Sequence, residues 1–261
     1  MSKRAFVRGL WGIYDNERRF YKRRQKMDDD IQFLKMTKYQ SPCFTYAFGA
    51  ENAKFLRSYG FECKQLSEEP ILWDMDTQQF RHKLEIFKAA MEDFDEIVFL
   101  DWDTVQIKPL PKDFWQILKS KGDFQAILRM YHRTKAQWRA TDRRKIPCAS
   151  FVYIADKTVP SKLIELWEKH DRPWSEEIVM ARYMDEQMGG WKGLDYYWDH
   201  FEPDFFVLDE GRVFTTDQLG SKDHRFSHIN APTRSKILRR RKRVPEWINL
   251  SKLGSRRRNN V

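Results

Sequence analysis

Two acidic residues separated by a single position, Asp101 and Asp103, are the part of the sequence best suited to chemistry. They follow the apolar run Ile97–Leu100, which is typical of a fully buried strand. Because side chains alternate along an extended chain, both carboxylates are expected on the same side. Unpaired charge at the end of a buried strand is costly, and paired carboxylate oxygens suit hard cations such as Mn²⁺ or Mg²⁺. The sequence therefore predicts a divalent-cation site at this pair.

The elements that precede the acidic pair are those that begin a nucleotide-binding α/β sheet. Cys43–Phe48 is predicted to be the first core strand, and Ala50–Tyr59 a helix that ends at a glycine. Phe61–Leu66 is predicted to be a second strand, and Phe80–Phe94 an amphipathic helix that leads into the buried strand. Ligands bind at the carboxyl edge of such sheets, where the acidic pair is expected.

The remaining elements are predicted to extend the sheet and to cover it with helices. They are the helix Phe114–Leu118, the strands Phe124–Leu128 and Ala149–Ile154, the helices Lys162–His170 and Glu176–Met188, and the strand Phe205–Leu208. Between the two middle strands, residues 129–147 lack periodicity and are predicted to form a long functional loop.

Composition places the chain among proteins with one large α/β domain or a domain with an appended subdomain. It has 261 residues with 41% hydrophobic and 15% aromatic content. No apolar run approaches the length of a membrane span, and the N-terminus lacks the apolar core of a signal peptide. The three cysteines are too few and too scattered for a disulfide framework or a zinc site. Free thiols in a reducing cytoplasm are expected.

Positive charge is concentrated at the C-terminal end of the sequence. Residues 233–261 hold eleven Lys and Arg against one acidic residue, which leaves 37 basic and 37 acidic residues elsewhere. We therefore divide the chain into a peripheral segment 1–40, a main domain 41–232 and a basic C-terminal tail 233–261. The tail indicates a polyanionic partner, either nucleic acid or an anionic membrane surface. The predicted loop mixes Arg133 and Arg139 with Trp138, a combination suited to stacking on bases beside a phosphate backbone.

Over roughly residues 43–232 the chain resembles the GT-A glycosyltransferases, and in pattern most closely the glycogenin-like and galactinol-synthase-like enzymes. The resemblance is carried by Lys83-Leu84 on a helix, the buried strand, Asp101-Trp102-Asp103, and Lys108-Pro109-Leu110 behind them. It implies a single Rossmann-like α/β domain with a mixed central sheet flanked by helices. It also implies a nucleotide-sugar donor, with a UDP-sugar expected, and Mn²⁺ (or Mg²⁺) on the diphosphate.

The resemblance also implies roles for individual residues. Donor-binding residues would be Tyr46, Ala47, Phe48, Lys83, Asp101, Trp102, Ser150 and Arg234; metal ligands would be Asp101, Asp103 and His228; catalytic acids would be Asp185 and Glu186; and Arg133, Trp138 and Arg139 would bind the acceptor. The family's Gly and Lys-Pro-Trp sequence after the late histidine is replaced here by Ala231-Pro232-Thr233-Arg234, so Arg234 or Lys236 would supply the phosphate-binding cation.

The expected reaction is transfer of the sugar to an acceptor hydroxyl, and the glycogenin-like pattern favours retention of the anomeric configuration over inversion. Two basic features beside one site favour a hydroxymethylated base in DNA as acceptor, as in phage-type DNA modification. A lipid-linked or polysaccharide glycan at a membrane face is the alternative acceptor.

Two further function classes compete with glycosyl transfer. Asp101-Trp102-Asp103-Thr104-Val105 also matches the D-x-D-x-[TV] pattern of haloacid-dehalogenase-type phosphatases, in which the first Asp is a nucleophile. That motif normally lies on the first core strand, whereas a β-α-β unit precedes it here. A non-catalytic basic binding module would explain the tail but not the buried acidic pair.

Overall fold

The structure is a computed structural model that describes residues 2–11, 27–67, 80–106, 109–110, 112–120, 122–130, 145–169, 175–187, 206–207, 226–228 and 248–249. Its centre is a six-stranded sheet in the order β3-β2-β1-β4-β7-β6. The strands are β1 (Arg4–Leu10), β2 (Cys43–Phe48), β3 (Cys63–Ser67), β4 (Glu96–Leu100), β6 (Phe124–Met130) and β7 (Lys145–Ile154). The strands β1 to β4 pair in parallel with one another, whereas β7 is antiparallel to both β4 and β6.

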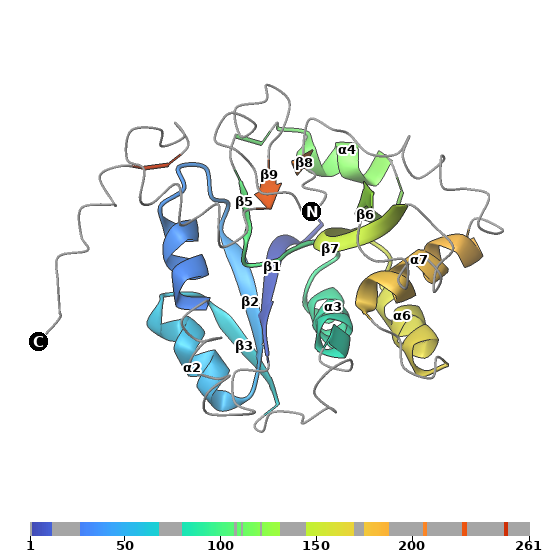
Figure 1. Ribbon diagram of the computed structural model, residues 1–261, viewed down its shortest axis with the longest axis horizontal. Helices are drawn as coiled ribbons and strands as arrows, with labels where there is room; N and C mark the ends of the chain where they lie inside the picture. The colour runs from blue at the N-terminus through green and yellow to red at the C-terminus, as the bar shows by residue number, and fades with distance from the viewer. Residues whose placement is uncertain are drawn as a thin grey trace, which may run out of the picture.

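Helices cover both faces of this sheet (Figure 1). They are α2 (Ala50–Ser58), α3 (Arg81–Asp93), α4 (Phe114–Ser120), α6 (Val159–Glu168), α7 (Glu176–Gln187) and a helix over residues 27–35. In α3 the buried residues Leu84, Phe87 and Met91 recur at helical spacing, so one stripe of this helix packs on the sheet. The mixed α/β architecture predicted from the sequence, a central sheet flanked by helices, is confirmed.

A second, three-stranded sheet lies directly after the acidic pair. Its order is β5-β9-β8, formed by β5 (Thr104–Gln106), β9 (Phe226–His228) and β8 (Phe206–Val207). The strand β5 begins one residue after Asp103 and pairs antiparallel with β9. A segment more than a hundred residues later in the sequence is thereby brought beside the acidic pair.

The interpretation of residues 1–40 as a peripheral segment is wrong for its first part. Arg4–Leu10 forms β1, which lies in the middle of the sheet and pairs in parallel with both β2 and β4. The pattern was obscured because Arg8, a charged residue with only 2% of its surface exposed, interrupts an otherwise apolar run. Cys43–Phe48 is consequently the second strand of the sheet rather than the first.

The predicted loop 129–147 is shorter than expected, because its two ends belong to strands. β6 continues to Met130 and β7 starts at Lys145, and the two strands pair along this stretch. Pro147 lies inside β7 opposite Leu128 of the edge strand. Proline disfavours strands, so its presence here hid the start of β7. Residues 131–144 lie outside the described part of the chain.

Part of the basic tail is attached to the body of the protein. Ile248 forms an isolated antiparallel bridge with Thr37, and the Asn249 amide donates a hydrogen bond of 2.7 Å to the Met36 carbonyl. The Ile248 side chain is 2% exposed and packs in a cluster with Trp102 and Val105. The other divisions of the chain into segments stay predictions. Within the described helices, none has the length and apolar character needed to cross a membrane.

Candidate active site

A buried lysine joins two carboxylates at the carboxyl end of β4. Lys83 Nζ lies 3.0 Å from Asp101 Oδ1 and 2.7 Å from Glu176 Oε1. The side chains of Lys83 and Glu176 are each 5% exposed, whereas that of Asp101 is 31% exposed. Lys83 belongs to α3, Asp101 is the residue after β4, and Glu176 lies in the first turn of α7. Two elements far apart in sequence are therefore tied to the end of the central strand.

Alternation along β4 explains why the cluster forms on this face. Ile97 and Phe99 belong to the core cluster that includes α3 and α7, so Asp101 continues the same face. Lys83 lies near the start of α3, the helix that packs on this face. The predicted association of Lys83 with the acidic pair therefore has a structural basis, although the sequence did not indicate the ion pair itself.

The electrostatics of the cluster keep the lysine charged. Burial by itself lowers the pKa of Lys83, but attraction to Asp101 and Glu176 outweighs it and raises the pKa above its ordinary value. Burial raises the pKa of the Glu176 carboxyl; Lys83 opposes this, while the nearby carboxylates add to it. One cation therefore holds two acids, of which only Asp101 has substantial contact with solvent.

The acidic pair itself lies in a tight turn between β4 and β5. The Asp101 amide donates to the Ser150 carbonyl at 3.1 Å, and the Thr104 amide donates to the Asp101 carbonyl at 2.9 Å. Asp103 is half-buried in this turn. Thr104 is paired with His228 in the ladder between β5 and β9, so the backbone of His228 lies beside the turn.

The residue types gathered here fit a hard divalent cation. Two carboxylates with at least partial exposure match the oxygen ligands that Mn²⁺ accepts. Among the described side chains, no group of three His, Cys, Asp or Glu is placed to hold a metal ion. The side chain of His228 lies outside the described residues, so its predicted role as a ligand stays a prediction.

Two buried residues that sequence reasoning missed contact this region. Glu176 is the partner of Lys83, and Arg8 of β1 donates hydrogen bonds to the carbonyls of Asp101 and Thr104. Glu176 looks like an ordinary acidic residue in the first turn of a helix. The sequence signal of Arg8 is a charge in the middle of an apolar run.

The predicted donor-binding residues of β2 are buried, and their roles in donor binding stay predictions. Tyr46 and Ala47 are 0% exposed and Phe48 is 4% exposed. The Tyr46 hydroxyl donates to Asp93 Oδ2 at 2.8 Å. Asp93 is ten residues after Lys83 on the same helix, about 15 Å away along its axis. Tyr46 therefore does not belong to the cluster around Asp101, because its side chain points toward the other end of α3.

Ser150 and Trp102 do lie at the turn, but through buried contacts. Ser150 is 5% exposed and supplies its carbonyl to the Asp101 amide. Trp102 is 7% exposed, and its ring packs edge-on against Phe61. Both residues support the acidic pair rather than present an open surface.

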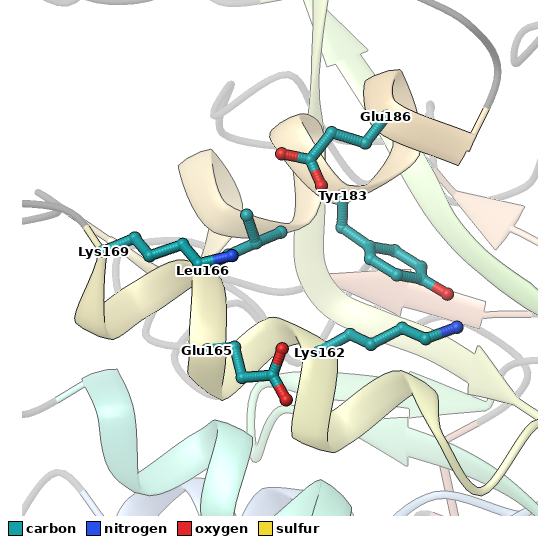
Figure 2. Close-up of a pocket in the computed structure, with 6 residues that line it drawn as sticks. All are labelled: Lys162, Glu165, Leu166, Lys169, Tyr183 and Glu186. Atoms are coloured by element: carbon teal, nitrogen blue, oxygen red, sulfur yellow. The ribbon is translucent and has the colours of Figure 1, made fainter.

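Glu186, one of the predicted catalytic acids, lies at the other end of α7 from Glu176. Ten residues separate the two, which corresponds to about 15 Å along the helix. Glu186 is exposed and lines a pocket of about 250 Å³ between α6 and α7, shown in Figure 2. The pocket is also lined by Lys162, Glu165, Leu166, Lys169 and Tyr183. The structure does not bring Glu186 to the Lys83 cluster.

Several predicted site residues lie outside the described part of the chain. They are Arg133, Trp138 and Arg139 of the loop, Arg234 and Lys236 of the tail, and the side chain of Asp185, whose backbone belongs to α7. Their predicted roles stay predictions.

No protein-family model and no curated protein matches this chain. Solved glycosyltransferases are similar in structure. The glycosyltransferase GlyE of Streptococcus pneumoniae TIGR4 is 16% identical with a TM-score of 0.41, over 72% of this chain and 44% of GlyE. A glycosyltransferase involved in glycosylation of the major capsid of PBCV-1 is 12% identical with a TM-score of 0.40, over 90% of this chain and 96% of that one. Apo mouse xyloside xylosyltransferase 1 is 11% identical with a TM-score of 0.44, over 88% of this chain and 98% of that one.

This chain thus spans less than half the length of GlyE. All three TM-scores lie below 0.5, and similarity at this level carries no conclusion about activity. The fold and site define a mixed α/β protein in which Lys83 binds Asp101, the first residue of the acidic pair, at the carboxyl edge of the parallel strands. Function is inferred from that site.

Proposed function

We propose that this chain is a glycosyltransferase of the GT-A type, which moves a sugar from a nucleotide-sugar donor to an acceptor hydroxyl with the help of Mn²⁺ or Mg²⁺. One observation carries the proposal. Lys83 is paired with Asp101 at the carboxyl end of β4, where Asp103 and the strand that bears His228 also lie. Carboxylates for a metal and a fixed cation in one place are what departure of a diphosphate requires.

Each residue of the site has a part in this reaction. Asp101 and Asp103 would hold the cation, and His228 would complete its ligands. Lewis-acid stabilisation of the departing diphosphate is the chemistry that a cation bound here supplies. Lys83 remains charged and is paired with Asp101, and it would place a fixed positive charge near the leaving group. Ser150 holds the main chain of Asp101.

The finer parts of the proposal rest on sequence. A UDP-sugar is the expected donor, transfer with retention is the expected outcome, and the cytoplasm is the expected location. A hydroxymethylated base in DNA is the proposed acceptor, supported by the eleven basic residues in the tail. Ile248 ties this tail to the core cluster that contains Trp102. A glycan at an anionic membrane surface is the alternative acceptor.

The phosphatase alternative is less well supported by the structure. Asp101 follows β4, the fourth strand in chain order, whereas the nucleophile of that class follows the first core strand.

The test is donor hydrolysis with a panel of nucleotide sugars in the presence of Mn²⁺. We expect release of the nucleoside diphosphate, its loss on chelation, and a fall of about 10²-fold or more in Asp103→Asn. Asp95→Asn is the matched control, because Asp95 lies just before β4, at the opposite end of the same strand, and it should retain activity. Turnover that is indifferent to chelation and to Asp103→Asn would refute the proposal.

The acceptor is tested in the same assay. Stimulation by hydroxymethylated DNA alone supports the nucleic-acid acceptor, and stimulation by a lipid-linked or polysaccharide glycan supports the alternative. Release of phosphate from a simple phosphoester without any sugar donor would favour the phosphatase class.

A further inference from the structure

We propose that Arg8 is a positioning residue that sets the geometry of the turn Asp101–Thr104 and thereby the placement of its two carboxylates. This inference rests on the proposed function, since it concerns the residues that would hold the cation. It gives a role to β1, which lies in the segment 1–40 predicted to be peripheral.

The guanidinium of Arg8 donates hydrogen bonds to both ends of the turn. Nη1 donates to the Asp101 carbonyl, and Nη2 donates to the Thr104 carbonyl at 2.9 Å. The planar fork of an arginine presents parallel donors in fixed directions, so it fixes the separation and orientation of the two carbonyls. The residues between them, which include Asp103, are restrained as a consequence.

The turn makes a return contact with β1. Trp102 Nε1 donates to the Gly9 carbonyl at 2.6 Å, one residue after Arg8. The Arg8 guanidinium carbon lies 5.6 Å from the centroid of the Trp102 ring, within the range of a cation–π contact. Two side-chain to main-chain links therefore run in opposite directions between the same two segments. Arg8 contacts the carbonyl of Asp101 and Lys83 contacts its carboxylate, so the main chain and the side chain of Asp101 are held by different residues.

The burial of Arg8 argues that this geometry is needed rather than incidental. A buried charge is expensive, and apolar residues of similar volume are often equally or more stabilising in such places. β1 is already paired on both sides and does not need Arg8 to join the sheet. Moreover, Arg8 Nε is buried with no hydrogen-bond partner in the described part of the chain. Within the described residues, Arg8 thus leaves its Nε donor without an acceptor, whereas Nη1 and Nη2 donate to carbonyls of the turn.

The environment of Arg8 also faces the acids of the site. Burial lowers the pKa of Arg8, while Cys43, Asp101 and Asp103 act in the opposite direction. Burial also raises the pKa of the Cys43 thiol, so this neighbour is expected to be a neutral thiol. The interaction of Arg8 with the turn is consequently an attraction to carbonyls and to the two aspartates.

The test measures binding of Mn²⁺ alone, without any nucleotide sugar, by calorimetric titration of the full-length chain. Arg8→Lys keeps the charge but loses the fork, and Trp102→Phe keeps an aromatic ring but loses the hydrogen bond to Gly9. We expect each to weaken Mn²⁺ binding by about 10-fold or more, as is usual when residues that orient metal ligands are changed.

Tyr153→Phe is the matched control. Tyr153 is a fully buried residue of β7 whose hydroxyl donates to Glu96 Oε2 at 2.8 Å, so its loss disturbs a buried hydrogen bond at the other end of β4. Its Mn²⁺ affinity should equal that of the unaltered chain. Thermal unfolding of every variant separates loss of positioning from loss of fold. If Arg8→Lys does not fold, Trp102→Phe decides.

The outcomes separate this inference from the proposed function. If Asp103→Asn weakens Mn²⁺ binding but folded Arg8→Lys and Trp102→Phe bind as tightly as the unaltered chain, the role of Arg8 is refuted and the metal site stands. If the unaltered chain binds no Mn²⁺, or Asp103→Asn binds it normally, the metal site of the proposed function fails and the role of Arg8 fails with it.

Discussion

Replacing Lys83 by methionine should destabilise the protein through Glu176 rather than through Asp101. The substitution removes the cation that both acids share and keeps a side chain of similar length. Water can reach Asp101, whose side chain is 31% exposed, and can take over part of the role of the ammonium. Glu176 has 5% exposure, and the change would leave its charge buried without a partner.

The expected loss is about 3–5 kcal/mol, the usual cost of removing one member of a buried ion pair. This is a large part of the roughly 5–15 kcal/mol that stabilises a typical domain. Uptake of a proton by Glu176 would relieve the cost, because burial already raises the pKa of this carboxyl. The destabilisation should therefore be smaller in mildly acidic solution than at neutral pH.

The assay is urea unfolding at neutral pH, with two double variants beside the single one. Lys83→Met/Glu176→Leu replaces the buried pair by apolar groups and should recover most of the loss. Lys83→Met/Asp101→Asn removes the more exposed of the two acids instead and should recover little. A Lys83→Met variant within about 1 kcal/mol of the unaltered chain, or equal recovery by the two doubles, would refute the reasoning from burial.

Three other substitutions test other parts of the fold. Ile248→Ala should lower the unfolding free energy by about 2–5 kcal/mol, because its side chain is 2% exposed in the core; a loss below about 0.5 kcal/mol would mean that this part of the tail does not pack in solution. Gly9→Ala should cost about 1–3 kcal/mol, since a Cβ there would overlap Ile86 Cδ1, and Ile86→Val should relieve it in a double-mutant cycle measured by thermal unfolding. Burial raises the pKa of Glu96, but hydrogen bonds from Tyr153 and Arg4 outweigh it and hold the pKa below its ordinary value; its stabilisation is thus present above the unfolded pKa of about 4.3 and is lost as the pH falls through the folded value. Unfolding free energies between about pH 6 and about pH 3 should fall less steeply in Glu96→Gln, and equal slopes would contradict this.

Local pattern was sufficient to place the acidic pair at a strand end. An apolar run such as Ile97–Leu100, followed by two acids, allows few structural interpretations, because a buried strand must end where charge begins. The helix before this strand was equally evident from its apolar stripe, and Lys83 lies on that helix. These features depend on neighbours within a few residues, which is the range over which periodicity is informative.

Features set by distant contacts were not accessible in the same way. Glu176 acquires its partner only when α7 packs beside α3, and no spacing in the sequence connects it with Lys83. β1 was missed because Arg8 is stabilised by carbonyls of the turn after β4, which a local pattern does not contain. Tyr46 is expected at the donor site by resemblance, whereas its hydrogen bond to Asp93, at the other end of α3 from Lys83, depends on the packing of β2 against that helix.

The central position of β1 has a consequence for how the chain folds during synthesis. Arg8 and the turn that it holds are 93 residues apart in sequence, so at about 5–20 residues per second the first strand waits roughly 5–20 s for its partner. During this interval one edge of β1 has no neighbour, and unpaired edges favour aggregation. Added chaperones that cover exposed strand edges should therefore raise the yield of folded protein.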